Sequence, residues 1–483
     1  MASRPLHNTS ALGFLFEVAG RLLVWIIKMI SKLMWRVIVI AVCHPRTTVA
    51  LVVGYTLVRY LGAVEIAWAT GALLLLASTW KAAHRKSFEA TLGTWSRTWW
   101  RRWYSYRRTW LTVCTRCDLA VADGDKTHLP KIRKVATTPY WDRLEILPLI
   151  GQELNTYRDS AERLRIAFGA KRATAREIRP NLFELAFMRR DPLLVPVPAT
   201  PIPASLADVD YRALRVGVDE YGQPYTLSVL GGHTSIAGAS GAGKAGVGWN
   251  LLRALAPAIA AGLVRVVLVD PKGKELRQAK PLALSGDYAS TDPEDVLELL
   301  NRLVTEMNAA NERDGAAGER DFEIRPGRPL TLILVDELAP LLHYWPRSIR
   351  SKIEDALGLL LTQGRAAGYI VIGAIQEPTK DVFTIRDLFA RRIAMRLPTE
   401  SHTDAALVED AVKYGAECHL IPETTGVAEG VFFSLQAGAR ATVRARLGWV
   451  RDEHIQELVA YVLDARKVVD LDAHRGDAGR AAA

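Results

Sequence analysis

Cysteine is scarce in this sequence, with four residues among 483. A disulfide scaffold is therefore excluded, and a reducing compartment is expected for most of the chain. Hydrophobic residues make up 49% of the chain and charged residues 24%, which is ordinary globular usage and excludes wholesale disorder and collagen-like repeats. At roughly 150 residues per domain, the length predicts two or three folded units.

Acidic residues are rare in the first 137 positions, which hold 6 of them against 20 lysines and arginines, a net charge of +14. The rest of the chain carries a net charge of −4. The same first 137 residues also hold 9 of the 13 tryptophans. A basic, tryptophan-rich N-terminal part on a mildly acidic body predicts a membrane-facing module attached to a soluble one.

Residues 1–83 contain the longest apolar stretches. Residues 47–63 and 66–80 each lie near the lower length limit of about 17 residues for a spanning helix. Basic residues flank both stretches, so the positive-inside rule predicts a two-helix transmembrane hairpin with cytoplasmic flanks and a cytoplasmic body. A buried helical hairpin of a soluble core is the alternative. Residues 11–40 repeat charges at spacings of four and seven, which predicts a cationic amphipathic helix on the membrane surface or, alternatively, a partner-binding helix.

Residues 84–137 are interpreted as a juxtamembrane segment. Residues 95–110 interleave aromatic residues with arginines, a mixture that anchors chains to anionic lipid headgroups or binds nucleic acid. The position directly after a membrane hairpin favours lipid. Cys114 and Cys117 form a CxxC pair with His128 as the nearest further ligand, and two unligated thiols are favoured over a zinc site, which needs a second ligand pair.

Residues 138–195 predict a small α+β adaptor domain. Strand-like patterns at 143–149 and 181–189 enclose a helical pattern at 153–168. The proline-rich run that follows predicts a linker over 196–211. No residues with evident chemistry occur here, so a structural or coupling role is expected.

A glycine-rich loop follows a short strand predicted at 234–237 and precedes a predicted helix. It matches the pattern G-x-x-x-x-G-K, in which backbone amides surround phosphates and the lysine bridges β- and γ-phosphate charge. The N-terminus of the following helix points at the anion. The expected nucleotide-binding residues are Gly238, Ala239, Ser240, Gly241, Ala242, Gly243, Lys244 and Ala245.

Paired carboxylates end the apolar strand predicted at 330–335. The carboxyl end of such a buried parallel strand is where an open α/β sheet places its ligand. Asp336 is expected to hold Mg²⁺, and Glu337 to orient and activate the attacking water. The alternative is that the two acids merely cap a strand. Ala245 stands where a serine or threonine hydroxyl is expected, so either water replaces that ligand or hydrolysis is impaired.

Further motifs occur in order along the chain: DPKG at 270–273, QGRAAG at 363–368, and Gln376 after a strand predicted at 369–375. Together with the loop and the paired acids, they resemble the FtsK/SpoIIIE motor family of hexameric DNA translocases over residues 212–450. Other details are similar to the actinomycete conjugative members, the TraB/TraSA-type transfer proteins: RRDP at 189–192, the residue after the loop lysine, AMRLPTE at 394–400 and ECHLIP at 417–422.

The resemblance implies a RecA-like P-loop ATPase of the α/β class over residues 212–466. It implies ATP and Mg²⁺ as cofactors, double-stranded DNA as substrate, and a homo-hexamer. Arg365 corresponds to the arginine that reaches the neighbouring subunit's nucleotide, and Gln376 to the polar sensor that couples the γ-phosphate to DNA-facing loops. Glu377 departs from the arginine common in cell-division members. Lys272 is assigned either to a subunit interface or to the sheet edge.

The part of the sequence after Trp449 predicts one helix and a disordered tail over 467–483. The winged-helix module of the family does not fit there, so a separate DNA-recognition or mobile-element protein is expected to supply sequence-specific loading. The leading hypothesis is a membrane-anchored, ATP-driven translocase of double-stranded DNA in conjugative plasmid or integrative-element transfer. The alternatives are a type VII secretion-like protein-export ATPase and a nucleotide-binding membrane scaffold with impaired hydrolysis.

Overall fold

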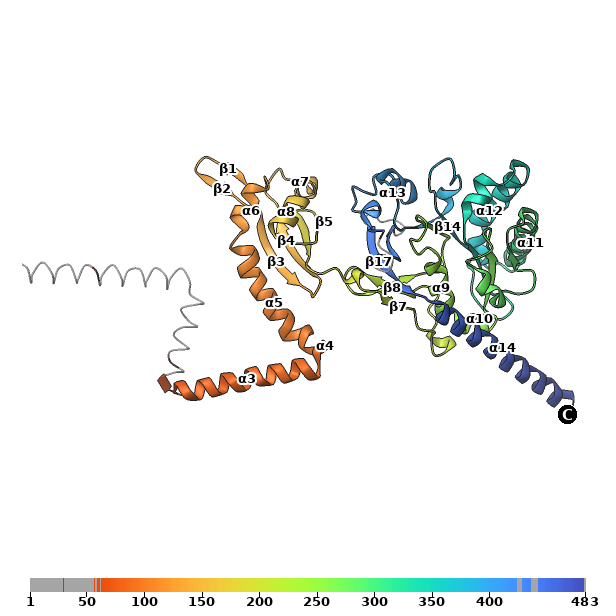
Figure 1. Cartoon of the computed structure of the whole chain (residues 1–483), viewed down its shortest axis with the longest axis horizontal. Helices are drawn as coiled ribbons and strands as arrows, with labels where there is room; N and C mark the ends of the chain where they lie inside the picture. The colour runs from red at the N-terminus through yellow and green to blue at the C-terminus, as the bar shows by residue number, and fades with distance from the viewer. Residues whose placement is uncertain are drawn as a thin grey trace, which may run out of the picture. The chain divides into compact units, whose positions relative to one another are not determined.

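The structure is a computed structural model that describes residues 29, 56, 59, 60, 62–423, 428–435 and 442–481, with the side chains of residues 86 and 468–481 left undescribed. It divides the chain into two compact units, Met1–Arg97 and Thr98–Ala483 (Figure 1). The amphipathic helix predicted at 11–40 and the first span predicted at 47–63 lie almost wholly outside the described residues.

The first unit is dominated by helix α3, Ala63–Ala83, which begins after Gly62. None of its side chains is buried, and its charged residues lie near its two ends, Glu65 and Lys81. Within the described part of the chain, α3 is the one helix that is long and apolar enough to cross a membrane. It contains the second predicted span, 66–80, so the two-helix hairpin remains a prediction. Shorter helical segments follow: α4 (Arg85–Phe88), the π-helix η1 (Glu89–Gly93) and α5 (Thr94–Trp100).

The second unit begins with what we call the N-terminal sheet, four antiparallel strands in the order β3-β4-β6-β5. Helices cover one face of this sheet, since Tyr106 and Trp110 pack with Leu144, Tyr157 and Phe187 in one buried cluster. The elements are η2 (Arg101–Arg107), α6 (Trp110–Arg116), β1 (Val121–Asp123), β2 (Lys126–His128), β3 (Lys131–Thr137), β4 (Trp141–Leu147), α7 (Leu154–Asp159), α8 (Ala161–Ala167), β5 (Arg172–Arg179) and β6 (Leu182–Met188).

The predicted border at residue 138 falls inside this fold. Strand β3 begins at Lys131, and Tyr106, Trp110 and Cys114 from the predicted juxtamembrane segment belong to the buried core. The aromatic side chains that suggested surface binding are thus divided, because Tyr106 and Trp110 point inward while their neighbours stay exposed. Cys114 and Cys117 are free and buried, and burial raises the pKa of the Cys114 thiol to about 12, which disfavours the thiolate that metals require.

A fully buried carboxylate fastens η2 to the N-terminal sheet. Asp142 accepts hydrogen bonds from the Tyr106 hydroxyl at 2.7 Å and the Arg189 Nε at 2.7 Å, and it forms an ion pair with Arg101. Because a buried carboxylate is stable only when paired and hydrogen-bonded, loss of either arginine leaves a costly unbalanced charge.

The larger part of the second unit is the motor sheet, whose described strands run in the order β12-β11-β13-β14-β10-β15-β16-β17-β8-β9, with β7 beside β17. From β12 to β15 all neighbours are parallel, and from β15 to β9 all are antiparallel. The strands are β7 (Val197–Pro198), β8 (Leu214–Asp219), β9 (Pro224–Leu227), β10 (Thr234–Ala237), β11 (Val264–Val269), β12 (Tyr288–Ala289), β13 (Leu330–Val335), β14 (Tyr369–Ile375), β15 (Arg391–Ala394), β16 (Val431–Leu435) and β17 (Thr442–Trp449).

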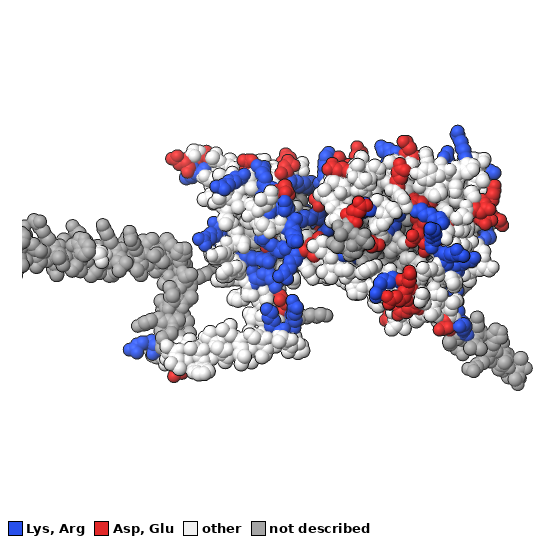
Figure 2. All heavy atoms as spheres, in the orientation of Figure 1, with Lys and Arg blue, Asp and Glu red and all other residues white. Residues whose placement is uncertain are grey.

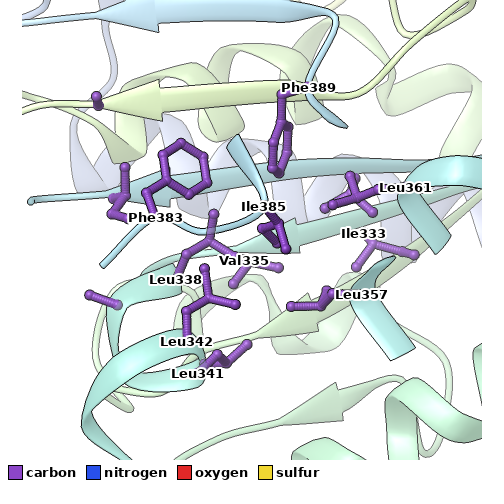
Figure 3. Packing of buried hydrophobic residues seen from close by; sticks show 14 of the residues in the cluster. Ile333, Val335, Leu338, Leu341, Leu342, Leu357, Leu361, Phe383, Ile385 and Phe389 are labelled. Carbon is purple, nitrogen blue, oxygen red and sulfur yellow. The ribbon is translucent and has the colours of Figure 1, made fainter. Parts of the chain in front are cut away.

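Helices cover both faces of the parallel part, which explains why its central strands are apolar throughout. Alternate residues of β13 enter two separate cores, Ile333 and Val335 on one face and Leu332 and Leu334 on the other. Figure 3 shows the first of these cores, where Leu357 and Leu361 of α12 approach Ile333. The helices are α9 (Ala245–Ala254), α10 (Ala256–Ala260), α11 (Pro293–Ala316), α12 (Arg347–Ala367), α13 (Glu400–Ala406) and α14 (Asp452–Ala481), with short helical turns η3 (Pro192–Leu194), η4 (Leu206–Asp208), η5 (Arg277–Leu282), η6 (Pro340–Tyr344), η7 (Arg386–Leu388) and η8 (Cys418–Leu420).

The structure differs from the sequence predictions at three points. The predicted linker at 196–211 contributes β7, which pairs in parallel with β17 at Val197 opposite Gly448. The N-terminal sheet and the motor sheet form one compact unit, joined by the Trp141 Nε1 that donates to the Glu220 carbonyl at 2.7 Å. The tail predicted at 467–483 is helical as far as Ala481, as the last part of α14, which begins at Asp452. The α/β class of the motor is confirmed.

Candidate nucleotide site

The glycine-rich loop lies where the sequence placed it, between β10 and α9. All four residues of β10 are buried, and the strand lies between β14 and β15, so the loop emerges at the carboxyl edge of the parallel strands. The loop is held against the neighbouring strand end by the Ala239 N–H, which donates to the Arg396 carbonyl at 2.8 Å. Helix α9 then starts at Ala245 and directs its N-terminus toward the loop.

Gly243 is required by both conformation and space. Its φ is +90°, in the region that favours glycine, and an added Cβ would lie 2.9 Å from the backbone nitrogen of Gly430. That nitrogen donates to the Ala242 carbonyl at 3.0 Å. The segment before β16 therefore braces the loop, an arrangement with no signal in the sequence motif.

Lys244 folds back onto its own loop. Its Nζ donates to the carbonyl of Gly238 at 2.8 Å and to that of Ala239 at 3.3 Å. Burial lowers the pKa of Lys244 to about 8, because the charged ammonium is poorly solvated there. An anion in the loop would stabilise this charge, so the lysine is poised to bind phosphate.

Asp336 and Glu337 follow β13 at the same edge of the sheet, but their surroundings differ. The Oδ2 of Asp336 is buried and has no hydrogen-bond partner among the described residues, and burial raises the pKa of this carboxyl to about 6. The Oε1 of Glu337 accepts the Gln376 backbone N–H at 3.0 Å, and its Oε2 pairs with the Lys272 Nζ at 3.1 Å. The first acid therefore has an oxygen without a hydrogen-bond partner among the described residues, while the second is fixed by two partners.

Lys272 reaches Glu337 because a neighbouring carboxylate folds its loop. The buried Asp270 accepts the backbone N–H of Gly273 at 2.9 Å and that of Leu276 at 3.1 Å, which turns the chain sharply after β11. Sequence reasoning noted this motif but left the lysine at an interface or the sheet edge. The structure puts it beside Glu337 in the same hollow as Lys244.

These groups line one hollow of about 650 Å³. Lys244, Lys272, Asp336 and the Gln376 side chain surround its polar end. Its other end is lined by apolar groups from α9, β17 and α14, and an aromatic ring there offers a stacking surface for a purine. These apolar residues have no motif and were missed by sequence reasoning: Trp249, Leu447, Trp449, Val450 and Ile455.

The residues present fit a divalent cation at Asp336. An unpartnered buried carboxylate oxygen is the kind of ligand that Mg²⁺ takes, usually together with waters and substrate phosphates. Ala245 lines the hollow without a hydroxyl, so it offers the ion no side-chain ligand. Asp336 is thus the protein group that would hold Mg²⁺, whose charge would neutralise the bound phosphates.

Arg365 lies elsewhere. It is on the last turn of α12, before β14, and lines a second hollow at the amino edge of the parallel strands. Strand β14 has seven residues, so the two edges lie about 20 Å apart, farther than an arginine side chain extends. Within one chain, the structure therefore brings together Lys244, Asp336, Glu337 and Gln376 but not Arg365.

Charge is unevenly distributed over the second unit. Figure 2 shows basic side chains gathered over the N-terminal sheet around β3, whereas acidic and basic side chains are interspersed over the motor sheet. A mixed surface gives the motor face in view no strong electrostatic preference for DNA.

The comparisons with known proteins agree with this geometry. A family model described as the FtsK/SpoIIIE family matches residues 210–413. The chain is 25% identical over 374 residues to the DNA translocase FtsK of Halalkalibacterium halodurans, covering 71% of this chain and 44% of that protein. It is 27% identical over 252 residues to the DNA translocase SpoIIIE of Bacillus subtilis, covering 49% of this chain and 30% of that protein. The chain therefore spans less than half the length of these relatives.

Among solved structures, the chain is similar to the conjugation coupling protein TcpA of pCW3 with ATPγS. The TM-score is 0.45 and the identity 18%, covering 72% of this chain and 97% of that one. At this TM-score the likeness carries no weight for function.

Proposed function

Because residues 210–413 form an ATPase domain of the FtsK/SpoIIIE family, we propose that this chain is an ATP-driven translocase of double-stranded DNA. The observation that carries the proposal is the single hollow in which Lys244, Asp336 and Gln376 meet, with Glu337 fixed directly behind them. This arrangement has a cation for phosphate, a carboxylate for metal and a carboxylate for water, all at the carboxyl edge of the parallel strands.

Binding of the triphosphate uses groups that the loop already holds in place. Lys244 exchanges the carbonyls of Gly238 and Ala239 for phosphate oxygens, which restores the charge stabilisation that burial removes. The backbone amides of the loop and the N-terminus of α9 donate to the same phosphates. A purine stacks against the apolar end of the hollow, beside Trp449.

In the hydrolysis step, Glu337 acts on the attacking water. The carboxylate orients the water and accepts its proton as the oxygen attacks the γ-phosphorus, while the bond from that phosphorus to the β–γ bridging oxygen breaks and ADP leaves. The Lys272 pair holds Glu337 in place until a phosphate draws that ammonium away. Since Glu337 also accepts the Gln376 backbone N–H, a shift of the carboxylate moves the carboxyl end of β14. That link is the route from nucleotide state to the following loop.

The finer proposals rest on sequence motifs and on the first unit. We infer a multi-pass cell-membrane protein with a cytoplasmic motor, because α3 is an exposed apolar helix and basic residues flank it. The exposed rings of Trp100 and Tyr104 stack at 4.8 Å, and the Arg107 guanidinium lies 4.4 Å from the Trp103 ring, a composition that suits anionic headgroups. The motifs similar to those of TraB/TraSA-type proteins support conjugative transfer by a hexameric ring as the finer proposal.

The test uses the full chain reconstituted in nanodiscs that contain anionic lipid. Its ATP hydrolysis is measured with and without linear duplex DNA, and movement is measured by displacement of a third strand from a DNA triplex. DNA-stimulated hydrolysis with displacement supports the proposal, and Glu337→Gln is expected to abolish both while retaining nucleotide binding. Hydrolysis that is indifferent to DNA would favour the protein-export function instead.

Ala245 supports a second candidate, a nucleotide-binding membrane scaffold. Without the hydroxyl, the metal has fewer protein ligands, and a chain that binds ATP without turnover would serve as a switchable scaffold. Binding without turnover, together with turnover restored by Ala245→Ser, would establish this candidate and contradict the translocase.

A further inference from the structure

A second hollow, of about 780 Å³, lies at the amino edge of the parallel strands. Its floor includes Leu330, the first residue of β13, and Ile370, the second residue of β14. Arginines line it from three separate parts of the chain: Arg212 before β8, Arg320 after α11, and Arg365 at the end of α12. Asp321 is the one acid among the lining residues, so the hollow carries a net positive charge.

The three arginines differ from most arginines of the motor. In the described part of residues 210–466, most guanidinium groups have a carboxylate, a carbonyl or both as partners. The exceptions are six guanidinium groups that have no hydrogen bond or ion pair among the described residues. They belong to Arg212, Arg215, Arg277, Arg320, Arg347 and Arg365. Three of these six line the same hollow.

Neighbouring cations without partners repel one another, and an anion with several oxygens relieves that repulsion. Hydrogen-bonding side chains stand among the arginines, since Asn311, Thr362 and Gln363 also line the hollow. Guanidinium groups with neutral donors form the donor set that binds phosphate chains. The hollow therefore suits a polyphosphate rather than a single carboxylate.

The position of the hollow identifies the source of the polyphosphate. The first hollow, which Lys244 and Asp336 line and which we call the nucleotide hollow, opens at the carboxyl edge of the same strands. The second hollow, which we call the arginine hollow, opens at the amino edge. A ring of identical subunits joins opposite sides of each subunit head to tail. In such a ring, a basic hollow at the amino edge of one subunit is complementary in charge to a triphosphate bound at the carboxyl edge of the next.

We propose that Arg212 and Arg320 act with Arg365 as a three-arginine clamp on the triphosphate bound by the neighbouring subunit. This inference rests on the proposed function, since it requires a nucleotide at Lys244. It adds two positioning residues to the trans-acting arginine and makes nucleotide-dependent ring assembly a property of this hollow. The partner is a second copy of this chain in its ATP-bound form.

The first experiment measures assembly rather than turnover. Mass photometry of the full chain in nanodiscs follows oligomer formation as ATPγS is added, for the wild type and for the double variant Arg212→Gln/Arg320→Gln. The double variant is expected to need about tenfold more protein to assemble, while a fluorescent nucleotide binds its single subunits as in the wild type. Arg215→Gln, an exposed and unpaired arginine outside the hollow, is the matched control and is expected to behave as the wild type.

The second experiment mixes two defective proteins. Lys244→Ala subunits lack the phosphate-binding lysine but keep all three arginines, and the double-variant subunits have the reverse defect. If the arginines act across the interface, mixed rings contain double-variant nucleotide sites faced by intact arginines. Hydrolysis is then expected to recover at least about fivefold over the sum of the two separate proteins, from the roughly tenfold loss that missing charged contacts cause.

Three results would overturn the inference. Wild-type assembly by the double variant would show that the arginines have no partner across the interface. Absence of recovery in the mixture would place them in their own subunit's site, or in its structure. Weakened binding of duplex DNA with unchanged assembly would assign the hollow to DNA phosphates. If the wild type assembles with ATPγS but does not hydrolyse ATP, the proposed function fails and the clamp is still decided by the assembly measurement.

Discussion

The two hollows of the motor sheet hold their charges in opposite ways. In the nucleotide hollow, Lys244 is bonded to loop carbonyls and Lys272 to Glu337, so these two lysines have partners within the chain. In the arginine hollow, the three guanidinium groups have none among the described residues. The difference teaches that the chain satisfies the charges of Lys244 and Lys272 internally, whereas the arginine hollow leaves its cations available to an anion from outside the subunit.

The comparison predicts the largest effect for Arg365→Ala. Turnover should fall by about a thousandfold, since a trans-acting arginine stabilises charge that appears only in the transition state. Nucleotide affinity of the single subunit should not change, because Arg365 lies about 20 Å from its own nucleotide hollow. Steady-state hydrolysis and a fluorescent-nucleotide titration measure the two quantities, with Arg215→Ala as control. A loss of nucleotide affinity without a loss of turnover would contradict the assignment of binding to the nucleotide hollow and of trans-acting catalysis to the arginine hollow.

Removal of the lysine should have the complementary effect. Lys244→Ala is expected to weaken nucleotide binding by about a hundredfold, because a charge-assisted contact to phosphate contributes about 2–3 kcal/mol. Titration calorimetry measures this loss, and Lys413→Ala, an exposed lysine paired with Asp410, serves as control. Equal binding by Lys244→Ala and the wild type would mean that the loop does not cradle phosphate.

A smaller change is expected when the hydroxyl is supplied. Ala245→Ser should raise turnover up to about tenfold and lower the Mg²⁺ concentration that gives half-maximal rate, because the ion gains a ligand. A magnesium titration of the hydrolysis rate separates this effect from a difference in the fraction of active protein, which changes the maximal rate alone. Ala261→Ser, an exposed alanine after α10, is the control, and an unchanged magnesium requirement would refute the explanation.

The smallest expected effect is a pH dependence of nucleotide binding. Since the pKa of Lys244 is lowered to about 8, its ammonium is charged below that pH and neutral above it. Affinity measured without divalent cations should therefore fall about fourfold between pH 7 and pH 8.5, as the charged fraction falls. The same titration with Lys244→Met should be flat over this range. A wild-type affinity that rises with pH would exclude Lys244 as the titrating group.

The sequence predicted the nucleotide hollow well because its polar residues follow strands. Asp336 and Gln376 come directly after apolar strands, and Lys244 ends the glycine-rich loop that follows β10. Parallel strands bring their carboxyl ends to one edge of the sheet. The apolar end was not predictable, since Trp449 is brought there by antiparallel strands that carry no motif. The arginine hollow was equally hidden, because Arg212 and Arg320 become neighbours of Arg365 only through the strand order.

The N-terminal sheet was predicted less well. Its strands alternate in the ordinary way, but its core draws on Tyr106 and Trp110 from a stretch rich in arginine. Composition indicated an exposed surface there, but the Tyr106 hydroxyl donates to the buried Asp142 and the Trp110 Nε1 donates to the Pro130 carbonyl at 2.8 Å. The predicted linker contains the two-residue strand β7. The sequence did not predict it, because two residues that pair with the end of β17 leave no periodic pattern to detect.

Strand β7 lies on the chain that connects the N-terminal sheet with the motor sheet, and its pairing has a mechanical consequence. Residues 197–198 pair with β17. Thr200 is tied to helix α9, since the Thr200 N–H donates to the Asn250 side chain at 3.1 Å and Arg253 donates to the Thr200 carbonyl at 2.7 Å. Helix α9 starts at the phosphate loop, and β17 ends at Trp449. Tension on the chain between the two sheets is therefore transmitted to both the phosphate end and the purine end of the nucleotide hollow. It acts there as shear, so mechanical load and bound nucleotide act on the same backbone segments.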